Sequence, residues 1–341
     1  MSFTTNNYEI DFLNVNDADA ILIRCYDGET PYIILIDAGN LSSSEIIKRK
    51  LKSDYKNMFI DLAICTHPDK DHIGGFFGLL DDDEITINEF WLIDPAEYLD
   101  VDDIKHYRSK ENAVTAVRKV FEKPNDATQN LIDILESKPT ITYSVCAGNY
   151  HETIPIKVVA PSGKYYSEIV KDMVKDYGVK PYDESDTEKY DEDALPDEAD
   201  IKSTVLDMDD DPSSFNASSI VLLFTPGDGK KFLFAGDANC ASLYKMTEDY
   251  KLEVENVTIL KVPHHGSKHN MTTEIIDRLS PKISIISAIG SKKHPNNTLV
   301  SWLSKKGNVY STHKSGGGLH YHIGLPARQN TSSAIPLKKK S

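Results

Sequence analysis

The most informative part of this chain is the run Thr66-His67-Pro68-Asp69-Lys70-Asp71-His72. The apolar run Leu62-Ala63-Ile64-Cys65 precedes it, and Ile73-Gly74-Gly75-Phe76-Phe77-Gly78-Leu79-Leu80 follows it. An apolar run that stops at a polar turn and restarts with glycine and apolar residues predicts a strand, a tight loop and a helix. Such a loop holds its side chains in fixed directions. Four of these side chains are potential metal ligands, namely His67, Asp69, Asp71 and His72.

Two later apolar runs also end in metal-ligand residues. Phe232-Leu233-Phe234-Ala235 is followed by Gly236-Asp237, and Ile259-Leu260-Lys261-Val262 is followed by Pro263-His264-His265-Gly266-Ser267. Both runs are typical of buried strands. Because packing alone does not explain three strand ends with such side chains, we expect the three ends to form one metal site. The spacing in the first motif favours a turn around two ions over a single tetrahedral site.

The order H-x-D-x-D-H, G-D, H-H-G-S resembles the metallo-beta-lactamase superfamily, in particular the branch that includes the C-terminal domain of the DNA-uptake protein ComEC. Further similar segments are Phe12 to Val15 with Asp19 to Ile23, Leu35 to Gly39, and Asn216 to Leu223. The resemblance implies an α/β fold in four αββα layers, in which two mixed β-sheets pack face to face and helices flank them. Residues 1–341 would then form a single domain.

The resemblance also implies a centre of two divalent ions bridged by Asp237. Because consecutive residues of an extended chain point to opposite sides, we do not expect His264 and His265 to bind the same ion. The family pattern favours His265 as the ligand and leaves His264 facing the substrate, although the reverse assignment is open. The predicted ligands are His67 and Asp69 for one ion, Asp71, His72 and His265 for the other, and Asp237 for both. The predicted catalytic residues are Asp71, His264 and Asp237.

The sequence departs from the family pattern at three points. Asp69 stands where the best-known pattern has a histidine, and its oxygen donors favour manganese relative to an imidazole-rich zinc site. We therefore expect two Mn(II) or Zn(II) ions, with a preference for manganese. The family usually has a further histidine ligand before the bridging aspartate, and only His106 and His151 are available for it. His294 matches the first half of the family's H-P-H-P element, but Asn296 replaces the second histidine.

Other residues are candidates for supporting the ligands or the substrate. Asp37 could accept a hydrogen bond from a ligand histidine and fix its tautomer, although a role in the turn is equally open. Residues beside the histidine pair could contact a phosphate, with turn formation as the alternative. The predicted substrate-binding residues are Ser267, Lys268, Asn216 and His294.

The composition is typical of a soluble intracellular enzyme. The 341 residues suffice for one large core, and no apolar stretch approaches the length of a membrane span. The N-terminus has neither the basic start nor the apolar segment of a secretory signal. The cysteines have no metal or disulfide spacing, which favours reduced thiols. We therefore expect a cytoplasmic protein that does not associate with membranes.

The charge is unevenly distributed along the chain. The formal net charge of -15 argues against simple binding of nucleic acid by a basic surface. Acidic residues are concentrated between Asp183 and Asp211, where Lys189 and Lys202 are the only basic residues. We interpret residues 163–214, approximately, as an acidic insertion that could act as a lid or bind a protein partner. The run Lys338-Lys339-Lys340 forms a short basic C-terminal tail.

Periodicity predicts the elements outside the site. Three strands of an antiparallel meander are expected at Tyr8–Val15, Ala20–Cys25 and Tyr32–Ile36. An exposed helix is expected at Ser43–Tyr55 and an amphipathic one at Glu111–Lys123. Further helices are expected at 128–137, 273–279 and 299–305.

Three functions fit these features. The first is a dinuclear-metal phosphodiesterase or nuclease that cleaves DNA through a metal-bridging hydroxide, in DNA processing or defence. The second is a hydrolase of small phosphodiesters or esters, with a phosphocholine-, cyclic-nucleotide- or lactone-type substrate, which suits the acidic composition better. The third is a metal-stabilised binding protein, which the nearly complete ligand set disfavours.

Overall fold

The computed structural model describes residues 7–98, 127–177, 213–288, 294–312, 320–324 and 337. Several predicted features lie outside these residues, namely the helix at 111–123, His106, the acidic run 183–211 and the basic tail. Of the predicted insertion, residues 163–177 and 213–214 are described.

The first sheet, called sheet A, has seven strands in the order β13-β1-β2-β3-β4-β5-β6. The strands from β13 to β3 pair antiparallel, and those from β3 to β6 pair parallel, so the sheet is mixed. The predicted antiparallel meander of the first three strands is confirmed. The strands are β1 (Tyr8–Phe12), β2 (Ala20–Asp27), β3 (Thr30–Ala38), β4 (Phe59–Ile64), β5 (Thr86–Leu92), β6 (Ile141–Ser144) and β13 (Tyr321–Gly324).

The second sheet, called sheet B, has six strands in the order β12-β11-β10-β9-β8-β7. The strands β7, β8 and β9 pair antiparallel, whereas β9, β10, β11 and β12 pair parallel. The strands are β7 (Ile156–Ala160), β8 (Val221–Phe224), β9 (Phe232–Phe234), β10 (Ile259–Lys261), β11 (Ile283–Ile286) and β12 (Asn308–Ser311).

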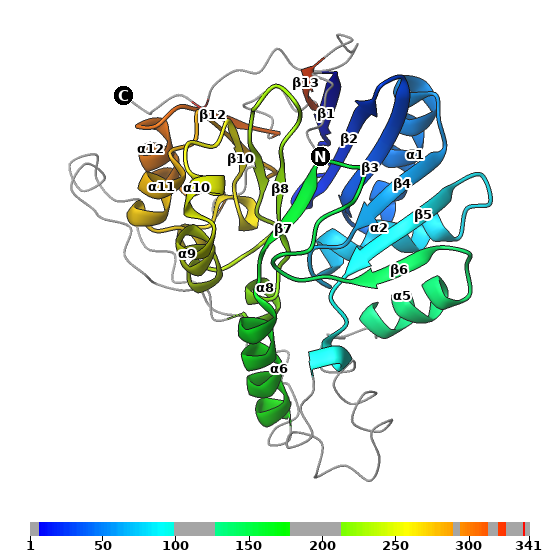
Figure 1. Ribbon diagram of the computed structural model, residues 1–341, viewed down its shortest axis with the longest axis horizontal. Coiled ribbons are helices and arrows are strands. Elements are labelled where there is room, and N and C mark those ends of the chain that lie inside the picture. Colours follow the sequence, from blue (N-terminus) through cyan, green and yellow to red (C-terminus); the bar gives the residue numbers. More distant parts are fainter. Residues whose placement is uncertain are drawn as a thin grey trace.

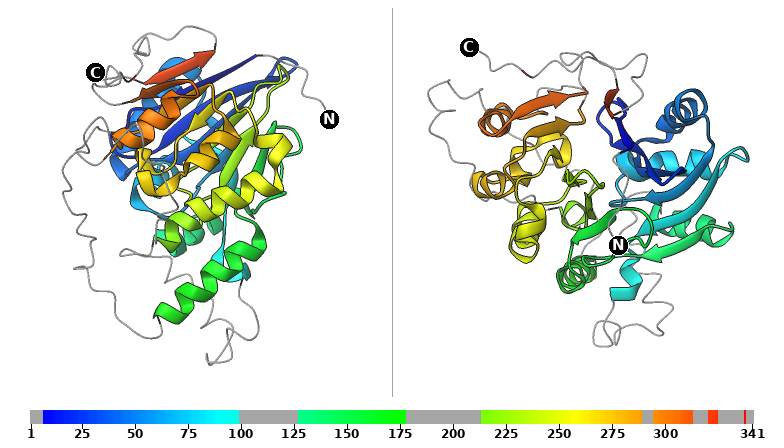
Figure 2. Two further views of the ribbon diagram at one scale, coloured as in Figure 1. Left: turned by 90° about the vertical axis from the view of Figure 1, so that its left-hand side faces the viewer. Right: turned by 45° about the horizontal axis from the view of Figure 1, so that its top comes forward.

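Helices cover the outer faces of both sheets (Figures 1 and 2). Those beside sheet A are α1 (Ser44–Lys50), α2 (Lys70–Leu80) and α5 (Ala127–Glu136). Those beside sheet B are α9 (Cys240–Asp249), α11 (Thr273–Leu279) and α12 (Asn297–Ser304). The remaining α-helices are α6 (Gly163–Tyr177), α8 (Ser214–Ala217) and α10 (Lys251–Val254). Short turns are η1 (Leu41–Ser43), η2 (Leu51–Tyr55), η3 (Pro95–Tyr98), η5 (His264–Gly266) and η6 (Lys268–Asn270).

Three apolar clusters hold these layers together. The central cluster lies between the sheets, where Phe12 of sheet A approaches Phe234 of sheet B with ring centroids 6.1 Å apart. A second cluster joins sheet A to its helices through residues such as Phe76, and a third joins sheet B to its helices through residues such as Leu243. The predicted α/β sandwich of two mixed sheets flanked by helices is therefore confirmed. Within the described ranges, no helix has both the length and the apolar character needed to cross a bilayer.

The segment predicted as an exposed helix at Ser43–Tyr55 differs from that expectation. It divides into the end of η1, the helix α1 and a π-helical turn, η2, which ends where Lys56 adopts a left-handed conformation. Ile47, Leu51 and Tyr55 are buried in the cluster that joins sheet A to its helices. The prediction was wrong about exposure because one face of this segment packs against the sheet. The first strand is also shorter than predicted, since β1 ends at Phe12.

Candidate metal centre

The candidate centre is built where both sheets contribute loops at the carboxyl ends of strands. Asp71 and His72 lie in the first turn of α2, directly after β4 of sheet A. Asp237 follows β9, and His265 lies in the turn η5 after β10, both in sheet B. One potential ligand atom from each of these four residues lies within 4.8 Å of the others. Three strand ends therefore meet at one point, and each sheet supplies two of the four residues.

The distances around Asp237 place the first-motif histidines on its two oxygens. His72 Nε2 lies 3.4 Å from Asp237 Oδ1 and 3.7 Å from Asp71 Oδ2. His67 Nε2 lies 3.9 Å from Asp237 Oδ2 and 3.7 Å from Asp69 Oδ2. His265 Nε2 lies 3.0 Å from Asp71 Oδ2. Asp237 thus faces His72 with one oxygen and His67 with the other.

Asp37 controls the tautomer of His72. Asp37 Oδ2 accepts a hydrogen bond from His72 Nδ1 at 2.8 Å, because a carboxylate can only accept. His72 therefore carries a proton on Nδ1 and presents Nε2 to Asp71 and Asp237. A carboxylate behind the ring is the usual arrangement for a histidine that binds a metal. The predicted contact between Asp37 and a candidate ligand histidine is present, and its role in metal binding stays a prediction.

Thr66 links Asp37 to His67 and sets the tautomer of His67 as well. Its hydroxyl lies 2.8 Å from Asp37 Oδ2 and 3.1 Å from His67 Nδ1. Since the carboxylate accepts the only hydroxyl proton, the Thr66 oxygen must accept from Nδ1 of His67. His67 therefore also presents Nε2 to the carboxylates. Sequence reasoning did not assign a role to Thr66, because only the folded chain brings its hydroxyl against Asp37.

The third imidazole, His265, is held by a backbone carbonyl. Its Nδ1 donates to the Ser287 carbonyl at 2.8 Å, which leaves Nε2 to face Asp71. All three rings therefore turn Nε2 towards carboxylates. For His67 and His72, Nε2 is buried and has no hydrogen-bond partner among the described residues. Buried nitrogen atoms that face carboxylates without a hydrogen bond fit metal ligands, so the residues present suit a divalent ion.

The electrostatics of the cluster also suit a cation. Burial raises the pKa of Asp237, but the imidazoles of His72 and His264 outweigh burial and hold that pKa well below its usual range. The pKa of Asp71 is lowered in the same way, with His72 the largest favourable contribution. Burial lowers the pKa of His72, but Asp237 and Asp37 outweigh burial and raise it. The carboxylates of the site are therefore ionised and favour positive charge on His72, a charge that a bound divalent ion would replace.

The centre is open on its carboxylate side. The side chain of Asp69 is 42% exposed and that of Asp71 is 31% exposed, whereas His67 and His72 are fully buried. Solvent therefore reaches the cluster over the two aspartates, and the two imidazoles lie beneath them.

The sequence argument about His264 and His265 assumed an extended chain, and that assumption was wrong. Both residues have left-handed backbone conformations, with φ of 46° and 51°. Within this turn His265 belongs to the cluster of four, whereas His264 lies beside it. His264 Nδ1 is 3.1 Å from Asn270 Oδ1, and the Asn270 amide donates to the carbonyls of Asp237 and Ala238. Asn270 is therefore fixed as the acceptor for His264 Nδ1.

The predicted substrate-binding residues have different surroundings. Ser267 is buried, and its hydroxyl accepts from the backbone nitrogen of His269 at 3.2 Å, so it caps η6. Lys268 is exposed. Asn216 Nδ2 lies 3.3 Å from His264 Nδ1, and the His294 ring is centred 5.6 Å from that of His264. Burial and the nearby His264 lower the pKa of His294 to about 4, so this ring is neutral at pH 7.

His151, one of the two candidates for an additional ligand, makes its contacts elsewhere. Its Nδ1 accepts from the backbone nitrogens of Thr153 and Ile154, and its Nε2 lies 3.5 Å from Glu89 Oε2. Both ring nitrogens are thus engaged with residues outside the cluster.

Sequence reasoning also missed a buried ion pair below the centre, between Lys261 and Asp19. The available signal was a lysine within the apolar run Ile259–Val262 and an aspartate between two alanines. A charged residue in an apolar run indicates a buried partner.

A known protein matches this chain in sequence over a limited part of its length, whereas solved structures match its architecture over nearly all of it. No protein-family profile matches the chain. Over 103 residues it is 35% identical to ComE operon protein 3 of Bacillus subtilis, a match that covers 28% of this chain and 12% of that protein. The chain therefore spans only a small part of this relative.

In architecture the protein is similar to metallo-beta-lactamase-fold structures. The metallo-beta-lactamase fold protein YhfI of Bacillus subtilis has 9% identity and a TM-score of 0.44, over 93% of this chain and 100% of that chain. The metallo hydrolase Igni18 of Ignicoccus hospitalis has 13% identity and a TM-score of 0.44, over 94% and 100% of the two chains. These likenesses do not bear on the substrate.

Proposed function

We propose that this protein is a metal-dependent hydrolase that uses two divalent ions to cleave phosphodiester bonds in DNA. One observation carries the proposal. In each of three imidazoles Nδ1 donates a hydrogen bond to an oxygen of the chain, so that Nε2 faces Asp71, Asp69 or Asp237. Histidines that bind a metal almost always donate their other ring N–H to a carboxylate, a backbone carbonyl or another polar oxygen in this way.

Two ions are proposed because Asp237 has a histidine on each side. One ion would be held by His67, Asp69 and Asp237, and the other by Asp71, His72, His265 and Asp237. The mixture of carboxylate and imidazole donors suits Mn(II) or Zn(II). Because three of the proposed ligands are aspartates, their oxygen donors favour manganese. When bound, such ions lower the pKa of water and neutralise charge on a phosphodiester.

The residues of the chain have distinct roles in this proposal. Asp71 and Asp237 would hold the ions, and Asp71 is 31% exposed on the open side of the site. His264 has its Nδ1 fixed by Asn270, so Nε2 is the nitrogen that would exchange a proton with the substrate or leaving group. His294, neutral at pH 7, and Asn216 flank His264 and would contact the substrate. Lys268 would contact a phosphate from the surface.

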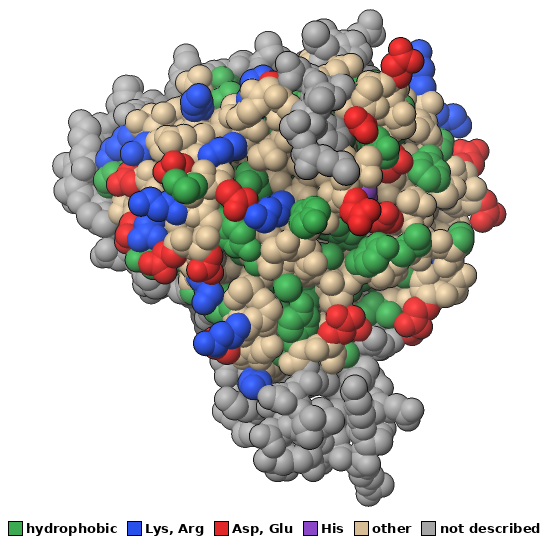
Figure 3. Space-filling view, in the orientation of Figure 1, with side chains coloured by type: hydrophobic (Ala, Val, Ile, Leu, Met, Phe, Trp, Pro, Cys, Tyr) green, Lys and Arg blue, Asp and Glu red, His purple; other side chains and the backbone are tan. Residues whose placement is uncertain are grey.

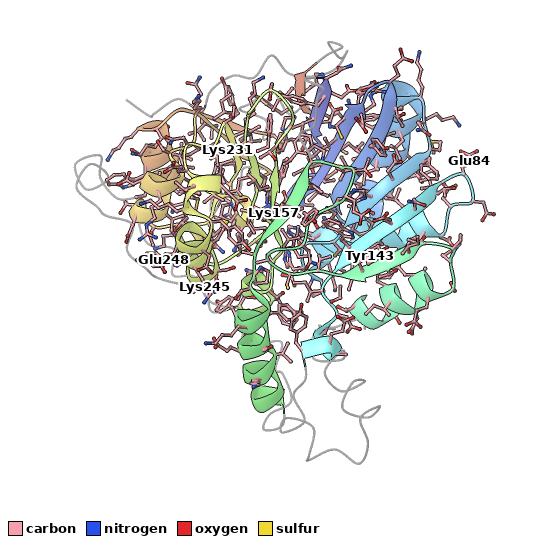
Figure 4. All side chains as sticks on the ribbon, viewed as in Figure 1. Glu84, Tyr143, Lys157, Lys231, Lys245 and Glu248 are labelled. Carbon is pink, nitrogen blue, oxygen red and sulfur yellow. The ribbon has the colours of Figure 1, made fainter. Side chains whose placement is uncertain are left out.

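The distribution of surface charge bears on the choice of substrate. Figure 3 shows lysine and arginine side chains mixed with acidic ones over the sheet-B half, while on the sheet-A half most of the charged side chains in this view are acidic and lie among hydrophobic ones. Lys157, Lys231 and Lys245 lie on the sheet-B half (Figure 4), and Lys157 is paired with Glu253 at 2.7 Å. DNA would therefore approach from the sheet-B side or be delivered by a basic partner. The acidic insertion is the proposed surface for such a partner.

The scarcity of basic side chains on the face of sheet A in Figure 3 favours a second candidate, a hydrolase of small phosphodiesters or esters, because a small substrate needs no basic surface. None of the four cysteines, all of which lie within the described residues, forms a disulfide, which supports a reducing compartment such as the cytoplasm.

The test starts from metal-stripped protein resupplied with Mn(II), Zn(II) or Mg(II). Single- and double-stranded DNA, RNA and bis(p-nitrophenyl) phosphate are offered to the unmodified protein and to Asp71→Ala, His72→Ala and His151→Ala. We expect DNA cleavage that both ligand variants lose and His151→Ala keeps. If only the small diester is cleaved, the protein is instead a hydrolase of small phosphodiesters, the second candidate. Full activity in either ligand variant would refute the proposed site.

A further inference from the structure

Lys261, at the end of β10, is a buried lysine directly below the candidate centre. It is 1% exposed and forms an ion pair with Asp19, which is also 1% exposed. Its Nζ donates to the Gly236 carbonyl at 3.0 Å and lies 3.8 Å from Asp237 Oδ1.

Asp19 ties this lysine to the other half of the site. Asp19 directly precedes β2 of sheet A, and its backbone nitrogen donates to the Asp71 carbonyl at 3.1 Å. Its carboxylate also lies 3.8 Å from His72 Nδ1. The contacts of Lys261 and Asp19 therefore run from the Gly236-Asp237 turn of sheet B to the Asp71-His72 turn of sheet A.

The relative position of the two sheets sets the distances between the candidate ligands, since each sheet supplies two of the clustered four. The apolar cluster between the sheets is non-directional and fixes their separation better than their lateral position. An ion pair with a further hydrogen bond is directional, and buried polar groups are retained in some proteins for structural specificity.

We propose that the Asp19–Lys261 pair is a cross-sheet clamp that positions Asp237 against Asp71 and His72 for metal binding. Lys261 is a positioning residue in this role, because it acts through Gly236 and Asp237. The inference rests on the proposed function, and it assigns a role to two buried charges that the proposed chemistry does not use.

The direct test measures binding of Mn(II) and Zn(II) to metal-free protein by calorimetric titration. Lys261→Met keeps the length of the side chain and removes its charge, and Lys261→Met with Asp19→Asn removes both charges together. We expect both proteins to bind metal at least about tenfold more weakly, as for other residues that support ligands. The matched control is Lys230→Met, since Lys230 is 51% exposed and pairs with Asp228 at 2.7 Å. It should bind metal as the unmodified protein does.

Unmodified affinity in folded Lys261→Met would overturn the clamp. The same holds for the double variant, because recovery there would mean that Lys261 only neutralises Asp19. If Lys261→Met does not fold, the double variant, which has no unpaired buried charge, decides the matter.

A second measurement separates failure of the clamp from failure of the proposed function. If the unmodified protein binds no metal, the proposed function fails, and the clamp is then judged by urea unfolding of the metal-free proteins. The double variant should lose less stability than the sum of the losses in Lys261→Met and in a single Asp19→Asn variant. Additive losses would refute a coupled pair across the sheets.

Discussion

Thr66 offers the sharpest test of how the imidazoles are prepared for metal. Thr66→Val keeps the shape of the side chain and removes the hydroxyl that accepts from His67 Nδ1 and donates to Asp37. His67 Nδ1 would then lack its acceptor within a buried site, and the ring would be free to place its proton on Nε2 instead. We expect the variant to fold and to bind poorly the ion that is assigned to His67, Asp69 and Asp237.

The size of the effect follows from the hydrogen bonds that Thr66→Val removes. A buried donor without an acceptor costs about 1 to 3 kcal/mol of unfolding free energy. Loss of a residue that orients a metal ligand lowers metal affinity by about 10- to 100-fold. Asp37 keeps its hydrogen bonds from the Thr66 backbone nitrogen and from His72. The affinity for the other ion, which is assigned to the His72 side of Asp237, should therefore fall less.

The assay is calorimetric titration of metal-free protein with Mn(II), combined with urea unfolding. Thr66→Ser is the matched control, since it retains the hydroxyl and removes only a methyl group, and it should bind within about twofold of the unmodified protein. The reasoning is refuted if Thr66→Val and Thr66→Ser bind both ions equally well.

Three further predictions concern stability and the limits of the site. His320, whose pKa burial and Lys50 lower to about 4, should make the protein lose about 2 kcal/mol of stability between pH 6.5 and 4, and His320→Asn should remove this loss in urea unfolding. Gly75→Ala should cost about 2 to 3 kcal/mol and weaken metal binding, because its Cβ would lie 2.0 Å from the Ala38 carbonyl oxygen. His151→Ala should leave metal affinity unchanged in the same titration.

The sign for His320 follows from proton binding. An unfolded histidine titrates near 6.5, so between about pH 6.5 and 4 the unfolded chain binds more protons than the folded one, and acid favours unfolding. The stabilising contribution is complete above that range. An equal acid sensitivity in His320→Asn would contradict this assignment. Gly163→Ala is the control for Gly75→Ala, because its Cβ would come no closer than 3.3 Å to a side-chain atom, and it should leave stability and metal binding nearly unchanged.

The fold was predictable because its signals are local and repeated. Apolar runs such as Leu62–Cys65 end in polar turns. This pattern predicts a buried strand followed by a loop from the segment alone, whatever the strand packs against. The helix at Ser43–Tyr55 was misjudged in exposure, since its buried face is apparent only once sheet A lies beneath it.

The sequence by itself determined the elements and the residue types that could bind metal, because periodicity and spacing are properties of one segment at a time. Only the tertiary structure decided which nitrogen each imidazole presents, since Asp37 reaches His72 and Thr66, and the Ser287 carbonyl reaches His265, only in the folded chain. The same holds for Lys261 and Asp19, which are 242 positions apart. Hydrogen bonds and ion pairs act over a few ångströms, so distance in space, and not distance along the chain, sets their partners.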